Sequence, residues 1–313
     1  VGSLASLVGI GAITLGIIEG PLKGWTDPLV LGGLIIGVVG IIAFVAWELH
    51  TDKPLLDVRL FKLAGFSTGS ISIFLQFVAA FGFFFTASQF LAFVFDYSPL
   101  LIGLGLLPIG VTIPLASGLA PKLITAYGRG PVGGAGLAIL AAGAAMFSFV
   151  GVDSSYWQFA IAVLVFGFGF GLAAPPATEA IVEALPSNKQ GVASAINDVT
   201  RELGGALGIA VVGSFLTAGY RSSVESSDAL PAPLVEPISD SAGAGLAIAG
   251  ETAAGGDRQL AGSIIDTVRS GIADGFGQAM LVAAAVAGVG AIYVAIRTPR
   301  NATPLVEELV ADG

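Results

Sequence analysis

Long runs of apolar residues, separated by short stretches rich in Gly, Pro and charge, make up most of this chain. Each run approaches the ~20 residues that an α-helix needs to cross ~30 Å of hydrocarbon. Breaking the sequence at Pro, Gly and charged clusters predicts eight membrane-spanning helices, at residues 3–19, 28–48, 66–94, 99–120, 131–151, 157–180, 191–218 and 276–297. The runs lack the alternation over ~10 residues that is typical of barrel strands. We therefore predict an all-α, polytopic membrane bundle.

Composition supports lipid as the solvent of this fold. The 313 residues are 55% hydrophobic and 11% charged, with 45 Gly, 16 Pro and a mean hydropathy of +0.89, which is typical of polytopic membrane proteins. The absence of Cys excludes disulfides and thiolate metal sites. The net charge of −9 gives little reason to expect nucleic acid as a partner. A single His and no acid–base cluster disfavour a membrane enzyme, and we expect no cofactor.

The connecting segments differ in character. Residues 49–65 alternate charge with Leu, Val and Phe, which predicts an amphipathic connector on the membrane surface. Residues 219–275 are rich in Ser, Ala, Gly, Pro and acids, so we expect a largely flexible extracellular loop, with an amphipathic helix in its second part. The opening residues carry neither Met nor the basic region of a signal peptide. We interpret them as the start of a hydrophobic helix in part of a longer protein or in a reading frame with an unusual start.

The distribution of basic residues predicts the orientation of the spans. One set of connectors carries Lys53, Arg59, Lys62, Lys122, Arg129, Lys189, Arg297 and Arg300. The short loops of the other set carry Lys23 alone, and three further Arg residues fall in the long loop. Because cytoplasmic loops carry an excess of Lys and Arg, both termini should be cytoplasmic in a cell-membrane protein.

The most unusual stretch is GVASAINDVTRELGGALGIAVVGSFL, residues 191–216, where Asp198, Arg201 and Glu202 fall within five positions of a hydrophobic span. On a helix, one stripe carries Asn197, Arg201, Gly204, Gly205 and Gly208. Small residues at this spacing permit close helix packing in lipid. A lone Arg at the bilayer centre costs about 2.5–3.5 kcal/mol. Arg201 should therefore face protein or water and be paired, with Asp198 as the nearest candidate.

Three interpretations of this charged cluster stay open. The cluster could be a latch on the cytoplasmic side, in which Arg201 and Asp198 hold helix ends or an opposing bundle in one gate state. Alternatively, Asp198 or Glu202 could titrate during a transport cycle or give charge to a cavity. A third interpretation is a solvated helix end, if the helix enters the membrane near Leu203.

Two further groups of residues are candidates for a pathway. Gln76 and Gln89 lie in a span with nine Phe residues, and such an aromatic, weakly polar wall suits flat lipophilic cations. The alternative is that most of these rings fill the core or face lipid. Pro108, Pro114, Pro175 and Pro176 are expected to break or bend their helices, as helix breaks often border transport pathways.

Several motifs resemble one branch of the major facilitator superfamily, the fourteen-helix drug:proton antiporters. EGPLKGW followed by WELHTDKPLLDVRLFK is similar to the turn and connector of that branch's two extra central helices. SQFLAFVFDYSPLLIGLGLLPIG resembles its next helical pair, and residues 191–210 resemble its pattern of Ser, Asn, Arg and repeated Gly. GLAPKLITAYGRGPV is similar to a degenerate copy of the superfamily's cytoplasmic loop motif, with Gly118, Lys122, Gly128 and Arg129 retained.

The resemblance implies a domain organisation and a function. Residues 1–48 would be the two central helices, residues 66–297 the C-terminal six-helix bundle, and residues 298–313 a cytoplasmic tail. A complete member has six further helices, so an N-terminal bundle would be a missing partner. The implied function is secondary active efflux of lipophilic, often cationic compounds in exchange for protons, with lipid, a small substrate and protons as partners. The alternative is a non-transporting scaffold, or a half-transporter that needs a separately encoded N-terminal bundle.

Overall fold

The computed structural model describes residues 2–51, 54, 58–185 and 190–298, and in this part of the chain helices joined by short turns are present and strands are not. The prediction of an all-α fold is therefore confirmed. The helices in chain order are α1 (Gly2–Lys23), α2 (Pro28–His50), α3 (Ala64–Phe93), α4 (Pro99–Gly105), α5 (Leu107–Tyr127), α6 (Arg129–Met146), α7 (Tyr156–Glu183), α8 (Gln190–Glu225), α9 (Ala232–Asp240), α10 (Ala242–Ala254) and α11 (Arg258–Arg297). Two 3₁₀ turns, η1 (Val58–Lys62) and η2 (Phe147–Phe149), accompany them.

Within the described residues, eight helical segments are long and apolar enough to cross a membrane, and they coincide with the eight predicted spans. The fourth span is divided into α4 and α5, because the helix is interrupted at Leu106, just before Pro108. Part of the predicted connector 49–65 forms η1, whereas residues 52–53 and 55–57 lie outside the described part. The basic residues Lys53, Lys189 and Arg300 also lie outside it.

Local sequence signals fix where several helices begin. Asp27 caps α2 by accepting a hydrogen bond from the backbone N–H of Leu29 at 2.8 Å, and Pro28 follows at the first helical position. Ser155 and Gln158 form a capping box at the start of α7. These caps satisfy amide groups that lack partners within the helix, which sets the boundaries of spans whose interiors are uniformly apolar.

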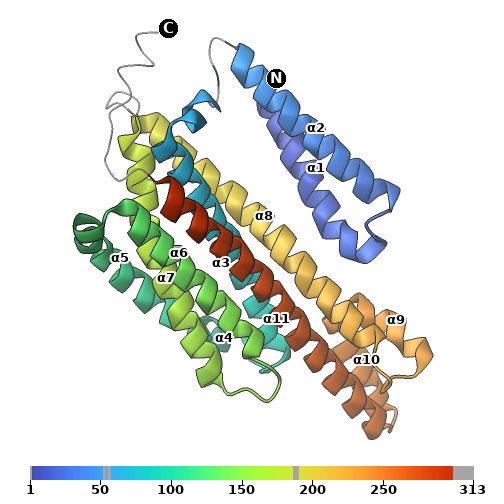
Figure 1. Cartoon of the computed structure of the whole chain (residues 1–313). Coiled ribbons are helices and arrows are strands. Elements are labelled where there is room, and N and C mark those ends of the chain that lie inside the picture. Colours follow the sequence, from blue (N-terminus) through green and yellow to red (C-terminus); the bar gives the residue numbers. More distant parts are fainter. Residues whose placement is uncertain (1, 52–53, 55–57, 186–189, 299–313) are drawn as a thin grey trace.

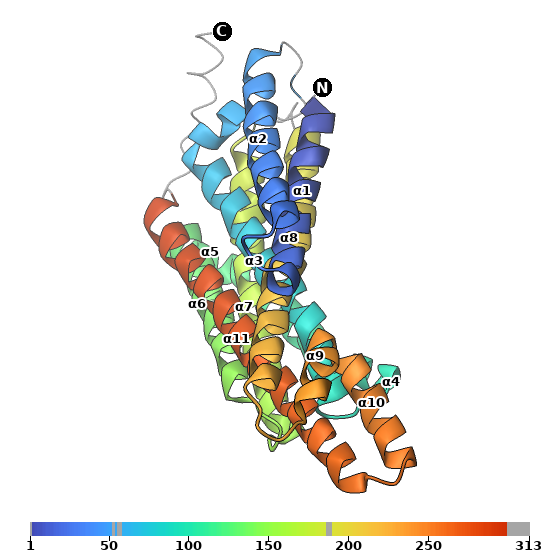
Figure 2. The same ribbon diagram turned by 90° about the vertical axis from the view of Figure 1, so that its right-hand side faces the viewer.

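The helices form a bundle with a hairpin beside it (Figures 1 and 2). We use "the bundle" for α3 to α8 together with α11, and "the hairpin" for α1 and α2. In the bundle, α3 packs against α7, α8 and α11, while α7 also packs against α5 and α6. The hairpin helices pack on each other, and α1 also packs against α8. The start of α1 and the end of α11 lie at one end of the molecule, and α9 and α10 lie at the other.

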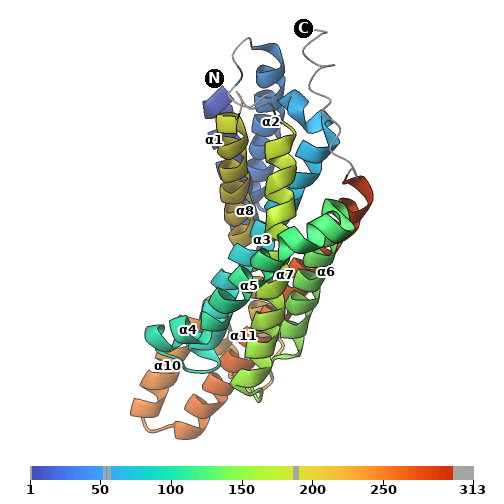
Figure 3. The same ribbon diagram turned by 90° about the vertical axis from the view of Figure 1, so that its left-hand side faces the viewer.

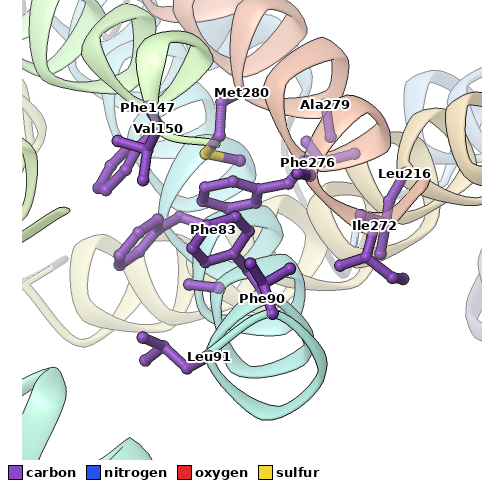
Figure 4. Close-up of a cluster of buried hydrophobic side chains, with 14 of the residues drawn as sticks. Phe83, Phe90, Leu91, Phe147, Val150, Leu216, Ile272, Phe276, Ala279 and Met280 are labelled. Atoms are coloured by element: carbon purple, nitrogen blue, oxygen red, sulfur yellow. The ribbon is translucent and has the colours of Figure 1, made fainter. Parts of the chain in front are cut away.

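Stacked Phe side chains fill the centre of the bundle (Figure 4). The ring of Phe83 lies 4.9 Å from that of Phe147, and the ring of Phe90 lies 4.7 Å from that of Phe276. Such offset and tilted aromatic pairs contribute about 0.5–1.5 kcal/mol beyond their area burial. Of the nine Phe residues in α3, those at 66, 83 and 90 are fully buried, and those at 81, 84 and 85 are exposed. Core filling therefore accounts for part of this aromatic run.

The expectation of a largely flexible loop over residues 219–275 differs from the structure. Here α8 continues to Glu225, α9 and α10 form a helical pair, and α11 begins at Arg258 (Figures 1 and 3). The expected amphipathic helix is present, but it is continuous with the last span. Ile264, Val268 and Ile272 are buried on this helix, and they share an apolar core with Ile238 of α9. This core stabilises a segment whose overall composition is typical of a loop.

The prolines have different outcomes. Pro108 follows a helix break, as expected, but α7 runs through Pro175 and Pro176 without a break. A proline within a helix removes the hydrogen bond to the carbonyl four residues earlier. For Pro175 that carbonyl is Gly171, and the Ser117 hydroxyl of α5 donates to it at 2.9 Å. A neighbouring helix therefore replaces the missing hydrogen bond.

Candidate functional site

The charged stretch of α8 lies where this helix packs closely on α3, and we call this contact the α3–α8 seam. Gly204, Gly205 and Gly208 are all buried in it. A Cβ atom on Gly204 would lie 2.6 Å from the carbonyl oxygen of Phe74, and one on Gly208 would overlap the carbonyl oxygen of Val78. Only glycine permits this approach of two backbones, which is a common mode of helix association in lipid.

Arg201 projects from the seam onto an aromatic ring. Its guanidinium carbon lies 5.4 Å from the centroid of the Phe77 ring. The expected pairing with Asp198 is not present, since no ion pair of Arg201 occurs in the described part of the chain. Its Nε atom is buried there without a hydrogen-bond partner. A cation–π contact contributes about 0.5–2 kcal/mol, so the ring compensates only in part for removing the guanidinium group from water.

The polar neighbours of Arg201 divide between two sides of α8. Asn197, one turn earlier on the same stripe, is half-buried, and its Oδ1 atom lacks a partner among the described residues. Asp198 and Glu202 are exposed. On the side of this turn that faces the bundle, the Arg201 Nε and Asn197 Oδ1 atoms therefore lack hydrogen-bond partners among the described residues. On the other side, the carboxylates of Asp198 and Glu202 are exposed.

The ring under Arg201 belongs to a small aromatic group contributed by two helices. Phe77 lies 5.9 Å from Phe81 of α3 and 5.5 Å from Phe170 of α7, measured between ring centroids. Phe81 is 42% exposed, so this group reaches the surface of the bundle. Because Arg201 already lies over Phe77, a cationic ligand could not use that face of the ring in the same conformation. The expected aromatic wall is thus reduced to the neighbouring rings.

The two Gln residues of α3 have different surroundings. Gln76 is fully buried, and its Nε2 atom donates to the Ser72 hydroxyl at 3.0 Å and to the Ala173 carbonyl of α7 at 3.4 Å. Its Oε1 atom has no partner among the described residues. Gln89 is half-buried and lies thirteen residues further along α3, which corresponds to about 20 Å along a helix. The structure therefore directs Gln76 toward α7 and places Gln89 about 20 Å further along α3, so the two amides do not form one site.

A second charged cluster lies near the end of the bundle where α1 starts. Arg129, at the start of α6, pairs with Glu183 near the end of α7 and has its Nε atom 3.4 Å from Glu179. The sequence pattern places Arg129 in a loop motif and does not by itself indicate a pairing with these acids. Two consecutive antiparallel helices bring the start of α6 and the end of α7 to the same end of the bundle. The opposite charges at these two positions were therefore a signal in the sequence for this pairing.

The other residues of that loop motif have separate positions. Gly128 ends α5 with φ of +86°, a backbone conformation that disfavours side chains. Gly118 has open space around the position of a Cβ atom. Lys122 is exposed and makes no ion pair within the described ranges. The backbone conformation therefore explains Gly128, and the ion pairs explain Arg129. Nothing in the structure explains Gly118 or Lys122.

Comparison with known proteins places this arrangement among transporters. The family model described as Major Facilitator Superfamily matches residues 1–209, which extend from the hairpin into the middle of α8. The multidrug resistance protein Stp of Mycobacterium tuberculosis is 32% identical over 77% of this chain and 46% of its own length. The multidrug efflux pump LfrA of Mycolicibacterium smegmatis is 32% identical over 82% of this chain and 51% of its own length.

A third relative has a narrower name. The methylenomycin A resistance protein of Streptomyces coelicolor is 31% identical over 69% of this chain and 45% of its own length. In each case the chain spans about half the length of the curated relative that it matches. The matched portion contains the α3–α8 seam and the Arg129 cluster, because both lie before residue 209.

Proposed function

The chain belongs to the major facilitator superfamily, and on this premise we propose that it forms part of a proton-coupled exporter of lipophilic, often cationic compounds. Alternating access in such transporters requires two groups of helices that rock about a site near the middle of the membrane. We propose that the bundle is one of these groups and that an N-terminal six-helix bundle is its partner. The names and greater lengths of the multidrug relatives support this proposal.

We also propose an orientation with both termini in the cytoplasm. The excess of basic residues in one set of connectors supports it. The start of α6 lies beside the end of α11, since a Cβ atom on Gly130 would lie 3.1 Å from the Thr298 side chain. The Arg129 cluster and the start of the charged stretch would then lie toward the cytoplasm, and α9 and α10 toward the outside.

The main support for this proposal is the environment of Arg201. The guanidinium group lies on Phe77 with a buried Nε atom that lacks a hydrogen-bond partner, while two carboxylates on the same turn are exposed. A buried polar group without a partner costs about 1–3 kcal/mol. We propose that Arg201 gains a partner in another state of the cycle, and that Asp198 and Glu202 give charge to the pathway and take up protons there.

Efflux of ethidium, a fluorescent cation, tests this function in cells that express the chain together with the proposed N-terminal bundle. We expect Asp198→Asn and Arg201→Ala to lower the efflux rate at least tenfold. Glu251→Gln, which removes an exposed carboxylate from α10 far from the seam, should leave the rate unchanged. A protonophore should stop efflux by the unmodified protein.

The possible outcomes separate the candidate functions. Normal export by both seam variants would remove Asp198 and Arg201 from the mechanism. Export that persists with the protonophore would remove proton coupling. Complete lack of export by the unmodified, membrane-inserted protein would favour the alternative of a non-transporting scaffold.

A further inference from the structure

A second polar feature lies near the opposite end of the bundle from the Arg129 cluster. A depression of about 540 Å³, open to the surroundings, lies between α8, α11 and the segment that follows α6, and we call it the outer cavity. This volume falls within the ~300–1,000 Å³ range of sites for small molecules. Its polar side chains are those of Ser148, Ser222, Ser223, Ser226, Asp274 and Gln278.

Close glycine contacts hold the walls of the outer cavity in place. A Cβ atom on Gly219 of α8 would lie 2.6 Å from the Cα atom of Gly275 in α11. A Cβ atom on Gly277 would lie 3.5 Å from the Cα atom of Ser148 in the third wall. The backbones of α8 and α11 are therefore closely packed here, and the third wall, which consists of η2 and the residues Val150 and Gly151 after it, lies in ordinary contact with α11.

One carboxylate determines the charge of the outer cavity. The Ser223 hydroxyl donates to Oδ2 of Asp274 at 2.9 Å, which orients the carboxylate. No cationic side chain pairs with Asp274 within the described ranges. The neighbouring cation on α8 is Arg221, which instead pairs with Glu225 at 3.1 Å and Asp240 at 3.9 Å. Asp274 is exposed, so the outer cavity presents to the surroundings a negative charge that no described cationic side chain neutralises.

From this lining we infer that the outer cavity binds a small hydroxylated organic ammonium ion, such as an amino sugar. The Asp274 carboxylate would accept charge-assisted hydrogen bonds from the ammonium group. The Ser222 hydroxyl and the Gln278 amide, which can both donate and accept, would contact the ligand's hydroxyl groups. A bare divalent cation fits less well, because it needs several carboxylate or carbonyl oxygens. The ligand class is hydrophilic, which distinguishes this site from the proposed path for lipophilic compounds.

Glucosamine and glucose form a matched pair of probes, because the first carries an ammonium group at pH 6 where the second carries a hydroxyl. Binding to the purified full chain in lipid nanodiscs can be measured by saturation-transfer NMR, without any need for transport. We expect saturable glucosamine binding that is about tenfold tighter than that of glucose. Asp274→Asn should remove this preference. Asp266→Asn, an exposed carboxylate of the same helix outside the cavity, should preserve it.

Several results would overturn the inference. These are no saturable binding of glucosamine, equal binding of the two sugars, or equal effects of the two Asp variants, which would indicate general surface charge. Ser222→Phe places a ring within the cavity from an exposed position and should abolish binding of both sugars while leaving the helical circular dichroism unchanged. Retention of glucosamine binding by this variant would place the ligand elsewhere. None of these results depends on drug efflux, so this inference and the proposed function can fail separately.

Discussion

The hairpin and the bundle are both assembled through glycine contacts, but they bury very different shares of their helices. In the apolar stretch of α1 only 17% of residues are buried, against 61% in that of α3. The hairpin is attached to the bundle along one side of α8, where the single proton of the Ser214 hydroxyl is shared between the Ile17 carbonyl at 2.7 Å and the Ala210 carbonyl of α8 itself at 2.6 Å. Arg221 of α8 also donates to the Leu22 carbonyl at 3.4 Å. The bundle thus has an extensive core, whereas the hairpin depends on one helix pair and a narrow contact.

Small-residue packing is therefore present both in a well-buried bundle and in a hairpin that is mostly exposed. In the bundle, glycines bring backbones together around stacked Phe side chains. In the hairpin, Gly9 and Gly37 bring α1 and α2 together, and exposed Leu, Ile and Val residues cover most of the outside. We therefore expect a destabilising substitution in the bundle to affect several of its helices. A destabilising substitution in the hairpin should affect α1 and α2 alone.

The largest effect is expected from Gly208→Ala in the α3–α8 seam. The added methyl group would overlap the backbone of Val78, which cannot move without shifting α3. Overpacking of this kind costs about 1–3 kcal/mol. Hydrogen exchange should accelerate throughout α3 and α8, and the unfolding temperature should fall. Gly118→Ala, at a helical position with open space, is the control and should neither accelerate exchange nor lower the unfolding temperature. Equal effects of the two variants would contradict the packing of the seam.

A smaller and local effect is expected from Gly37→Ala in the hairpin. Its methyl group would overlap the Ile13 side chain and lie 2.8 Å from the Ile13 amide nitrogen. Exchange should increase in α1 and α2 while α3, α6, α7 and α11 keep their protection. Gly32→Ala, where space is open, serves as the control on the same helix. Faster exchange in α3 or α7 would show that the hairpin is an integral part of the core.

The smallest effect is expected from Ser214→Ala, which removes a hydroxyl whose proton is shared between the Ile17 carbonyl of α1 and the Ala210 carbonyl of α8. Hydrogen bonds between membrane helices contribute about 0.6 kcal/mol on average, so exchange near Ile17 should rise by about threefold. Thr217→Ala removes a hydroxyl that bonds only within α8, to the Gly213 carbonyl at 3.1 Å, and should leave α1 unchanged. No difference between the two variants would mean that this bond does not attach the hairpin.

The sequence predicted the spans well because span length is a local property. A run such as residues 28–48 is continuous enough to require a helix in lipid whatever surrounds it. The segment around α9 and α10 was mispredicted for the same reason. Its composition is typical of a loop, and its helices depend on burial of Ile238 and Val268 against distant residues.

Charge partners were harder to predict than spans, because they depend on tertiary contacts. Spacing along one helix suggested Asp198 for Arg201, yet the guanidinium group lies on Phe77 of another helix. Arg129 and its acidic partners are about fifty residues apart in sequence. The outer cavity forms only where α8, α11 and the segment after α6 meet, so no single stretch of sequence indicates it.

We propose that the charged turn of α8 faces protein or water rather than lipid, and cysteine labelling can test this because the chain contains no Cys. In membrane vesicles, the Asp198→Cys variant should react rapidly with a charged, membrane-impermeant maleimide, and ethidium should slow that reaction. The Ile292→Cys variant, on an exposed apolar position of α11, should react only with a lipophilic maleimide. If the Asp198→Cys variant instead reacts only with the lipophilic maleimide, the charged turn lies against acyl chains, and the proposed role of Asp198 and Arg201 in a transport pathway is wrong.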